Sequence, residues 1–382
     1  MTNVKFATGT KAKVLVTGGA GFIGSHTCDL LLNKGYEVVI LDNLGKPVHD
    51  GSGGWPKYLD RRITKIKGDV VNKKDWMKAL KGVSFVIHLA AYQDLVPNFS
   101  RFFETNAVGT ANLFELIVEK KLPIKKVVVA SSQFVYGEGK YECRKHGTVF
   151  PQGREEKDLQ RGKWEPVCPT CGGGISRLDL TEDGHDPRNQ YSISKYTQEL
   201  IGLRLGKLYN IPTVAMRYSI VQGSRQSYRN CYSGVLRLFV TRMKLGIAPV
   251  IFEDGGQLRD YVSVKDVARA NVMMLENRAQ YETFNVGGGM AISVLEFANA
   301  VQKGIGTKTG YRITGEYRVG DTRHSVSDIS KIKKLGWRPK GNIEESIREY
   351  CAWIKDIKID KAKLIAADRK MRKVGMVRKA KG

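Results

Sequence analysis

The sequence predicts an α/β protein with a doubly wound parallel sheet and a smaller mixed C-terminal lobe. In the first half, short apolar runs alternate with amphipathic segments of helix length, a pattern typical of βαβ units. Crossovers between such strands are right-handed, which places helices on both faces of one sheet. The expected strands are 13–17, 37–41, 63–67, 84–89, 126–130 and 213–217, and the expected helices are 22–33, 73–80, 103–119 and 191–209.

Composition bounds the class of protein. Of 382 residues, 42% are hydrophobic and 9% aromatic, which excludes disordered and fibrous chains. No uncharged apolar run approaches the roughly 18 residues that span a bilayer, and residues 1–16 carry no secretory signal pattern. Six cysteines are too few for a disulfide scaffold. We therefore expect a soluble cytoplasmic protein without integral membrane contact.

The chain divides into five expected segments. A nucleotide-binding domain covers 1–136, a Gly- and Pro-rich insertion covers 137–188, and a helix with the domain's continuation covers 189–223. A smaller ligand-binding lobe covers mainly 224–360, and a basic tail covers 361–382. The tail holds nine Lys and Arg but only one acidic residue, Asp368, so we expect a solvated helix or a frayed end.

A glycine-rich turn follows the first expected strand. Gly18, Gly21 and Gly24 stand between strand and helix. The first permits a tight turn, the second lets backbone approach a pyrophosphate, and the third allows close packing of the helix on the sheet. Asp42 ends the next strand, where a carboxylate accepts hydrogen bonds from both ribose hydroxyls and repels a 2′-phosphate. The pattern predicts a Rossmann-like site for NAD rather than NADP.

A tyrosine and a lysine stand four residues apart on one face of the expected 191–209 helix. They are Tyr191 and Lys195. A phenol ordinarily has a pKa near 10, and a neighbouring ammonium together with a cationic nicotinamide favours the phenolate. We therefore expect these cations to lower the pKa of Tyr191 toward neutrality, so that it acts as a general base.

These motifs resemble the extended short-chain dehydrogenase/reductase family, in its branch of nucleotide-sugar epimerases similar to UDP-galactose 4-epimerase. The resemblance runs from about residue 12 to 356 and is interrupted by one insertion. The motifs that carry it are 17–24 with Asp42, 68–70, 88–91, 106–110 and 191–195.

The resemblance implies roles for individual residues. Ser132, Tyr191 and Lys195 would be catalytic, and a homodimer would pack the helices near 103–119 and 191–209. The implied NAD contacts are Gly18, Gly21, Phe22, Ile23, Gly24, Asp42, Asn43, Asp69, Val70, Leu89, Ala90, Ala91, Asn106, Tyr191, Lys195 and Tyr218. The implied substrate contacts are Ser132, Gln133, Arg225, Arg259, Arg318 and Asp321.

Two positions distinguish among the reactions of this family. Dehydratases carry an Asp-Glu pair after the catalytic hydroxyl, whereas this chain has Gln133 and Phe134, neither of which is an acid or base. The substitution favours epimerisation at C4 of a UDP- or dTDP-linked sugar through a 4-keto intermediate. Ile220 replaces an Asn that contacts substrate in many members, which leaves the sugar open.

Two alternatives remain. One is a nucleotide-sugar reductase or dehydratase of the same family. The other is a non-catalytic NAD-containing nucleic-acid-binding or scaffold protein, suggested by 63 Lys and Arg against 38 Asp and Glu, a formal charge of +25. The charge is spread along the chain, no stacking RNA-binding signature is visible, and Ser132, Tyr191 and Lys195 are all present. We therefore expect no specific nucleic-acid partner.

The insertion carries a candidate metal site. Two pairs of potential ligands, Cys143 with His146 and Cys168 with Cys171, each have the spacing of a zinc knuckle. Four protein ligands leave zinc no open position, so the predicted ion is structural. A redox cysteine pair or cysteines that lie close by chance are the alternatives. A similar insertion occurs in a subset of epimerases for dTDP-L-rhamnose-like sugars, and this one should border the sugar pocket.

Overall fold

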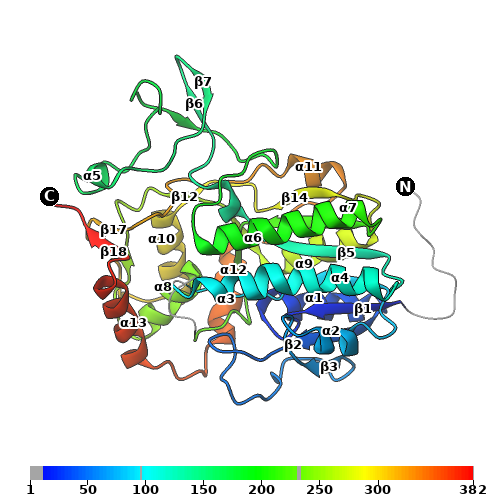
Figure 1. Cartoon of the computed structure of the whole chain (residues 1–382). Helices are drawn as coiled ribbons and strands as arrows, with labels where there is room; N and C mark the ends of the chain where they lie inside the picture. The colour runs from blue at the N-terminus through cyan, green and yellow to red at the C-terminus, as the bar shows by residue number, and fades with distance from the viewer. Residues whose placement is uncertain (1–11, 95–96, 230–233, 382) are drawn as a thin grey trace.

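A computed structural model describes residues 12–94, 97–229 and 234–381 (Figure 1). The chain forms a central parallel sheet with helices on both faces, a lobe at one end of that sheet, and a small β-rich insertion that projects from the body. Within these residues, no helix combines the length and the apolar character needed to cross a membrane.

The central sheet has seven strands, and all its neighbouring strands run parallel. Its order is β3-β2-β1-β4-β5-β9-β14, so the order reverses between β1 and β4. Ligands of doubly wound sheets bind at the carboxyl ends of the strands beside such a reversal. The strands are β1 Lys13–Thr17, β2 Glu37–Asp42, β3 Thr64–Lys67, β4 Phe85–His88, β5 Lys126–Ser132, β9 Thr213–Tyr218 and β14 Glu282–Val286.

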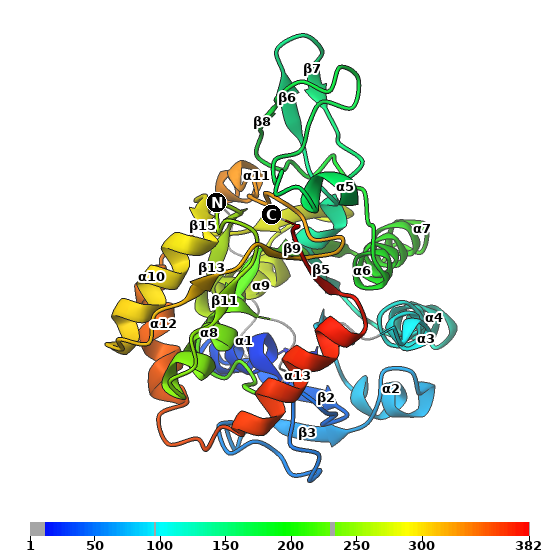
Figure 2. The ribbon, with the colours of Figure 1, turned by 90° about the vertical axis from the view of Figure 1, so that its left-hand side faces the viewer.

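Helices cover both faces of this sheet (Figure 2). Strand residues alternate between them: Val14 and Val16 join the core beneath α1 (Phe22–Asn33) and α9 (Val264–Glu276), whereas Leu15 joins the opposite core. The opposite face carries α2 (Lys73–Ala79) and two long helices, each interrupted by a π-helical turn. These two are α3 Phe99–Phe103, η1 Glu104–Val108 and α4 Gly109–Glu119, followed later by α6 Gln190–Leu200, η3 Ile201–Leu205 and α7 Gly206–Leu208.

The predicted elements of the sheet are confirmed, and β1 and α1 have the predicted bounds. The predicted 103–119 helix starts earlier, at Phe99. The predicted C-terminal lobe is less continuous than expected, because α9 and β14 return to the sheet and pack on α1 and β9. The hydrophobic pattern of α9 and β14 resembles that of the rest of the lobe. Only their contacts in the folded structure show that they belong to the sheet.

The lobe is held by three helices that share one apolar core. They are α8 (Val235–Lys244), α10 (Val294–Ile305) and α12 (Ile343–Trp353), and Phe297 at the centre is fully buried. The short helix α11 (Ser330–Lys334) packs beside β14. Pairs of short strands complete the lobe: β10 Ile220–Gln222 with β13 Tyr261–Ser263, β11 Val250–Ile251 with β16 Arg312–Ile313, and β12 Leu258–Arg259 with β15 Ile292–Ser293.

The insertion is a three-stranded antiparallel sheet with one short helix. Its elements are β6 Tyr141–Cys143, β7 Gly147–Val149, α5 Glu156–Leu159 and β8 Ser176–Arg177. Its own apolar cluster is small and comprises Tyr141, Cys143, Val149 and Cys168, with Ile175 partly buried against it. So small a core supplies little hydrophobic stabilisation.

The C-terminal segment contains a helix, as one of the two predicted alternatives had it, but one face of that helix is buried rather than solvated. It forms α13 (Lys361–Lys373) and β18 (Val377–Lys379), which pairs antiparallel with β17 (Glu316–Arg318). Leu364, Ala367 and Met371 lie on one face of α13 and are buried. The sequence did not reveal this apolar face, because its few apolar residues stand among many Lys and Arg residues.

Candidate active site

The glycine-rich turn after β1 has the geometry that its sequence predicts. Gly18 has φ +64°, and a Cβ there would lie 2.9 Å from the backbone nitrogen of Ala90. A Cβ on Gly24 would lie 2.2 Å from the carbonyl oxygen of Gly18, so α1 can begin here only if that residue is Gly. No side chain caps the N-terminus of α1, which leaves its first N–H groups available to an anion.

Asp42 lies beside this turn at the carboxyl end of β2. Its Oδ2 accepts a hydrogen bond from the N–H of Ala20 at 3.0 Å, and its Oδ1 accepts one from the N–H of Leu44 at 2.9 Å. These bonds fix the carboxylate beside the N-terminus of α1. If a dinucleotide placed its pyrophosphate at that N-terminus, its adenosine ribose would lie near Asp42. Asn43 and Asp69, two further residues of the predicted cofactor set, hydrogen-bond each other at 2.9 Å.

Other members of the predicted cofactor set also reach this edge of the sheet. Phe22, Ile23 and Tyr218 line the large cavity described below. Asn106 binds backbone and α6 instead: its Oδ1 accepts from the N–H of Tyr92, and its Nδ2 donates to Ser194 Oγ. Asn106 therefore positions the loop after β4 against α6.

Ser132 and Tyr191 meet at the end of β5. Ser132 is the last residue of that strand, and its hydroxyl forms a hydrogen bond with the Tyr191 side chain. Tyr191 lies in the first turn of α6, which a capping box between Asn189 and Ser192 fixes. A buried ion pair between Glu199 of α6 and Arg217 of β9 holds the helix on the sheet.

The electrostatics of Tyr191 differ from the prediction. Desolvation raises the pKa of Tyr191 to about 12, although the hydrogen bond with Ser132 opposes the shift. Lys195 is almost fully buried, and desolvation lowers the pKa of its ammonium to about 7. Its Nζ donates to Gln198 Oε1 rather than toward the phenol. Lys195 therefore does not by itself produce the expected fall in the Tyr191 pKa.

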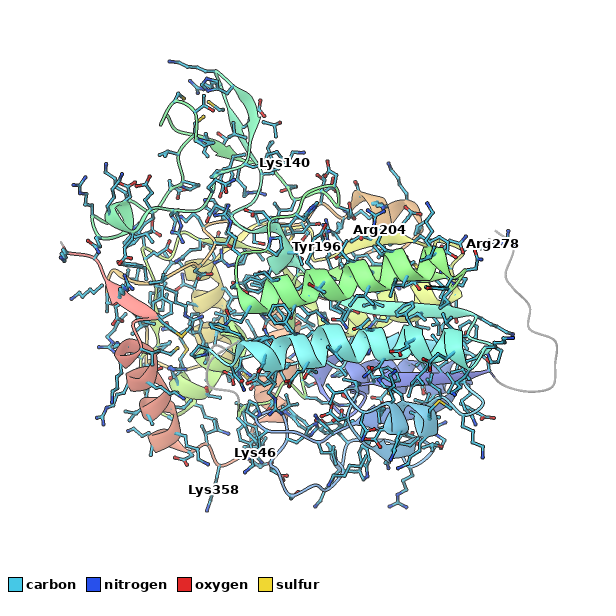
Figure 3. The ribbon with its side chains drawn as sticks, in the orientation of Figure 1. Lys46, Lys140, Tyr196, Arg204, Arg278 and Lys358 are labelled. Atoms are coloured by element: carbon cyan, nitrogen blue, oxygen red, sulfur yellow. The ribbon has the colours of Figure 1, made fainter. Side chains whose placement is uncertain are left out.

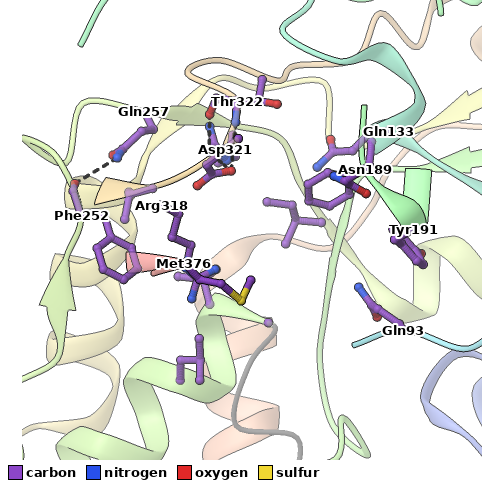
Figure 4. A pocket seen from close by; sticks show the side chains of 18 of the residues that line it. Gln93, Gln133, Asn189, Tyr191, Phe252, Gln257, Arg318, Asp321, Thr322 and Met376 are labelled. Carbon is purple, nitrogen blue, oxygen red and sulfur yellow. Dashed lines mark hydrogen bonds and ion pairs between the residues drawn. The ribbon is translucent and has the colours of Figure 1, made fainter. Parts of the chain in front are cut away.

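A cavity of about 1190 Å³ extends from Tyr191 into the C-terminal lobe (Figure 4). Gln133 lines its catalytic end, where the buried Oε1 has no hydrogen-bond partner. Figure 4 shows Gln133, Asn189 and Tyr191 on one side of the cavity and Phe252, Arg318 and Met376 on the other. The volume and the length of this cavity suit an extended ligand rather than a single sugar.

The far end of the cavity is cationic. Arg259 and Arg318 both line it, together with Asp321. Arg259 donates to the carbonyl oxygens of Thr322 at 2.7 Å and Arg323 at 2.8 Å, which fixes its guanidinium. Burial lowers the pKa of Arg318, whose Nε has no hydrogen-bond partner. An entering anion would supply the missing acceptor.

Arg225 is the one predicted substrate residue that the structure does not bring into this cavity. Its guanidinium forms an ion pair with Asp29 of α1 at 2.7 Å and lies over the ring of Tyr58. The family resemblance implied that Arg225 contacts the substrate. The tertiary contacts direct its side chain toward α1 instead.

The four predicted metal ligands come together in the insertion. The Cys143, His146, Cys168 and Cys171 ligand atoms all lie within 4.8 Å of one another. His146 Nδ1 is 3.6 Å from both Cys143 Sγ and Cys168 Sγ, and Cys143 Sγ is 3.9 Å from Cys171 Sγ. Zinc bonds of ~2.3 Å to sulfur and ~2.0 Å to nitrogen give tetrahedral edges of about 3.5 to 3.8 Å. The cluster therefore fits a tetrahedral zinc.

Sequence reasoning missed two groups of cavity residues. Arg154 of the insertion lines the cavity, forms a buried ion pair with Glu253, and donates to the carbonyl oxygen of Asp321. The C-terminal segment contributes Met371 and Met376, among others. Neither group belongs to a motif, although the apolar spacing of 364, 367 and 371 is a weak amphipathic signal.

Exposed basic side chains occur in at least two separate regions of the molecule. Lys46 and Lys358 lie at one edge of the view, whereas Arg204 and Arg278 lie at another (Figure 3). Each of the four is exposed.

Comparisons with known proteins agree with this geometry. The profile of the NAD dependent epimerase/dehydratase family matches residues 14–156 and 170–287. The chain is 31% identical to dTDP-L-rhamnose 4-epimerase of Burkholderia thailandensis, over 90% of this chain and 94% of that protein. It is 33% identical to a putative UDP-glucose 4-epimerase of Methanocaldococcus jannaschii, over 90% and 98%.

A solved structure extends the likeness to the fold. The UDP-glucuronic acid 4-epimerase of Bacillus cereus, in complex with UDP-glucuronic acid and NAD, superposes with a TM-score of 0.73 at 26% identity. The match covers 91% of this chain and all of that one.

The buried ammonium of Lys195 predicts a pH dependence of stability in the NAD-free protein. Above about pH 7 the folded chain releases this proton, whereas the unfolded chain keeps it to near pH 10.4, so stability rises with pH. Relative to Lys195→Met, the wild-type free energy of unfolding should increase by about 2 kcal/mol between pH 7 and 9. Urea denaturation at both pH values measures it, and equal pH slopes for the two proteins would contradict the assignment.

Proposed function

The chain belongs to the NAD dependent epimerase/dehydratase family, and on that premise we propose that it inverts the configuration at C4 of a nucleoside diphosphate sugar. The observation that carries this proposal is the single cavity that joins the Ser132–Tyr191 pair to the arginines of the lobe. A nucleoside diphosphate sugar has the matching order of groups, with the reacting sugar at one end and the diphosphate and base toward the other.

NAD fits the edge of the sheet around the β1 turn. The free N-terminus of α1 and Gly18 would receive the pyrophosphate, and Asp42 would accept hydrogen bonds from the adenosine ribose. When bound, NAD supplies the acceptor for the C4 hydride and returns it later. The positive charge that NAD carries on its nicotinamide would also favour the phenolate form of Tyr191, against the desolvation that raises the pKa of the phenol.

The residues of the chain supply positioning and proton transfer. Ser132 would hydrogen-bond the C4 hydroxyl of the sugar, and Tyr191 would remove the proton of that hydroxyl. After the 4-keto sugar has rotated in the cavity, Tyr191 would return the proton. Lys195, directly behind them on α6, would hold the nicotinamide ribose. Gln133 and Phe134 line the same end but cannot transfer protons, so water elimination has no acid–base pair there.

The nucleotide end would retain the intermediate. Arg259 and Arg318 would bind the diphosphate in charge-assisted hydrogen bonds, with Asp321 beside them. Binding energy from this remote group holds the keto sugar while its ring reorients. The sugar end carries both apolar side chains, such as Phe134, and polar ones, such as Gln93 and Gln133. This lining fits dTDP-linked and UDP-linked sugars alike, and both remain candidate substrate classes.

The insertion is proposed to bind structural zinc through Cys143, His146, Cys168 and Cys171. The donor set and its near-tetrahedral spacing support the proposal. With few apolar residues in the insertion, metal binding would contribute much of its folding free energy. All four positions on the ion would be filled, so the metal would take no part in the reaction at Tyr191.

A homodimer is proposed through the outer faces of α4 and α7. Val118 is 38% exposed, and Leu208 and Tyr209 are 68% and 51% exposed. These large apolar side chains stand on neighbouring long helices that flank the sheet (Figure 1). A self-associating four-helix contact would remove them from water, at roughly 25 cal/mol per Å² of apolar area.

Tyr191→Phe tests the proposed reaction. Removal of the phenolic proton acceptor should lower kcat for C4 inversion by about 10²-fold or more. The measurement is NMR of the C4 configuration after incubation with UDP- and dTDP-sugars. Tyr196→Phe, five residues along the same helix and outside the cavity, is the matched control and should keep full activity. Full-rate inversion by Tyr191→Phe would contradict the mechanism, and stoichiometric release of a reduced sugar would favour the reductase alternative.

Metal analysis tests the zinc proposal. Wild-type protein should contain one zinc per chain, and Cys143→Ser and Cys171→Ser should each lose it, because three ligands bind zinc far more weakly. Cys351→Ser in the lobe is the control and should retain zinc. Unchanged zinc content in both ligand variants would contradict the assignment.

Charge on the outer helices tests the homodimer. Val118→Glu combined with Leu208→Glu should convert a wild-type dimer into a monomer, because two carboxylates would be desolvated in the interface. Light scattering after size-exclusion chromatography gives the mass directly. Ile313→Glu, at an equally exposed apolar site in the lobe, should leave the dimer intact. A monomeric wild-type protein would refute the proposal.

A further inference from the structure

Residues 361–381, which we name the C-terminal strap, lie against the nucleotide end of the cavity. Asp368, Met371, Arg372, Met376 and Val377 all line it. Figure 1 places α13 near α8 and β18 beside β17, at the end of the molecule away from the β1 strand. The strap therefore belongs to the wall of the proposed substrate site, although nothing in its sequence resembles a nucleotide-binding motif.

Polar contacts hold the strap in place at both ends. Arg372 makes two hydrogen bonds to the carboxylate of Glu316 in β17, at 2.8 and 3.1 Å, and Asp368 forms an ion pair with Arg242 of α8. Farther along, the N–H of Lys381 donates to the carbonyl oxygen of Gln160 in the insertion at 2.8 Å. The strap thus spans the lobe, the β17 strand and the insertion.

The pairing of β18 with β17 sets the strap directly over a substrate residue. In this ladder Arg318 stands opposite Val377. The N–H of Val319 also donates to the carbonyl oxygen of Met376 at 3.1 Å. The strap therefore holds one edge of β17, the strand that carries Arg318. A displacement of the strap should also displace Arg318.

The strap directs apolar side chains into a cationic site. Met371 and Val377 are buried and Met376 is half-buried, yet all three line the cavity beside Arg318. Figure 4 shows Met376 next to Arg318 and near Phe252. Apolar surface adjoining guanidinium groups is the combination that a base followed by a diphosphate would bind.

We propose that the C-terminal strap is the outer wall of the nucleotide subsite and determines affinity for the nucleoside diphosphate. Met371, Met376 and Val377 cover the base, while Asp368 and Arg372 hold Arg242 and the β17 strand in position for the phosphates. This inference rests on the proposed function. No strap residue contacts Ser132 or Tyr191 among the interactions of the described residues, so the strap should affect binding and leave the chemical step unchanged.

Met376→Glu tests the strap with little risk to the fold, because the side chain is half-buried and faces the cavity. The new carboxylate would repel the diphosphate and remove apolar cover from the base. Calorimetry with UDP and with dTDP should show at least a tenfold rise in Kd for the nucleotide that wild-type protein binds. The sugar substrate should show a similar rise in KM, with kcat within twofold.

Val374→Glu is the matched control, since Val374 lies in the same strap, is 54% exposed and does not line the cavity. It should change Kd by less than twofold. A chain ending at Ile359 removes the strap entirely and should weaken nucleotide binding at least as much as Met376→Glu. Its NAD content reports whether the sheet domain remains folded.

The outcomes separate the strap from the proposed function. Wild-type affinity in Met376→Glu, or a loss of kcat with unchanged Kd, would overturn the role of the strap while leaving the epimerase proposal intact. Equal weakening by Val374→Glu would also overturn it, because the effect would then be one of charge alone. If wild-type protein binds neither UDP nor dTDP, both proposals fail together.

Discussion

The guanidinium of Arg217 is the point on which the geometry of the catalytic end depends. Its Nε and Nη2 donate to the carboxylate of Glu199 in α6, and its Nη1 donates to the carbonyl oxygens of Glu182 and Gly184 in the returning arm of the insertion. The same group lies 4.7 Å from the ring centre of Tyr136, which follows Ser132. One buried cation therefore links the segments that carry Ser132 and Tyr191 to the end of the insertion. Such a pair carries a large desolvation cost, so loss of either partner would leave an uncompensated buried charge.

The two ends of the cavity differ in their electrostatics. Desolvation dominates near Tyr191 and Lys195, where it raises one pKa and lowers the other. Fixed positive charge dominates at the lobe, where Arg259 is tied to backbone carbonyls and Arg318 has an unmet donor. In the proposed reaction, binding at the charged end would hold the substrate while its sugar ring rotates at the desolvated end.

The insertion is bonded to Arg323 and His324, which follow the cavity residue Asp321 in the chain. Glu165 accepts hydrogen bonds from Arg323 at 2.8 Å and pairs with His324 at 2.9 Å, and these contacts lower the pKa of Glu165 to about 2. Arg323 in turn binds Glu253, which also pairs with Arg154 of the insertion. Zinc would therefore stabilise an insertion that contacts Arg323 and His324. The strap also contacts the insertion, through the ion pair between Arg378 and Glu156 of α5.

Signals that act over a few residues were sufficient to predict the sheet and the local geometry of its glycine-rich turn. Strand and helix periods, the glycine spacing of the β1 turn, and the four-residue interval of Tyr191 and Lys195 all depend on local backbone geometry, which the sequence carries directly. The paired Cys and His spacing likewise predicted a cluster that the fold brings together. The sequence could not predict pKa values or side-chain positions that depend on residues distant in the chain. The Tyr191 pKa depends on how deeply α6 is packed, and the position of Arg225 depends on its pairing with Asp29. The strap became visible only once β18 had paired with β17, because sparse apolar residues among many lysines gain a fixed face only from the partner they pack against.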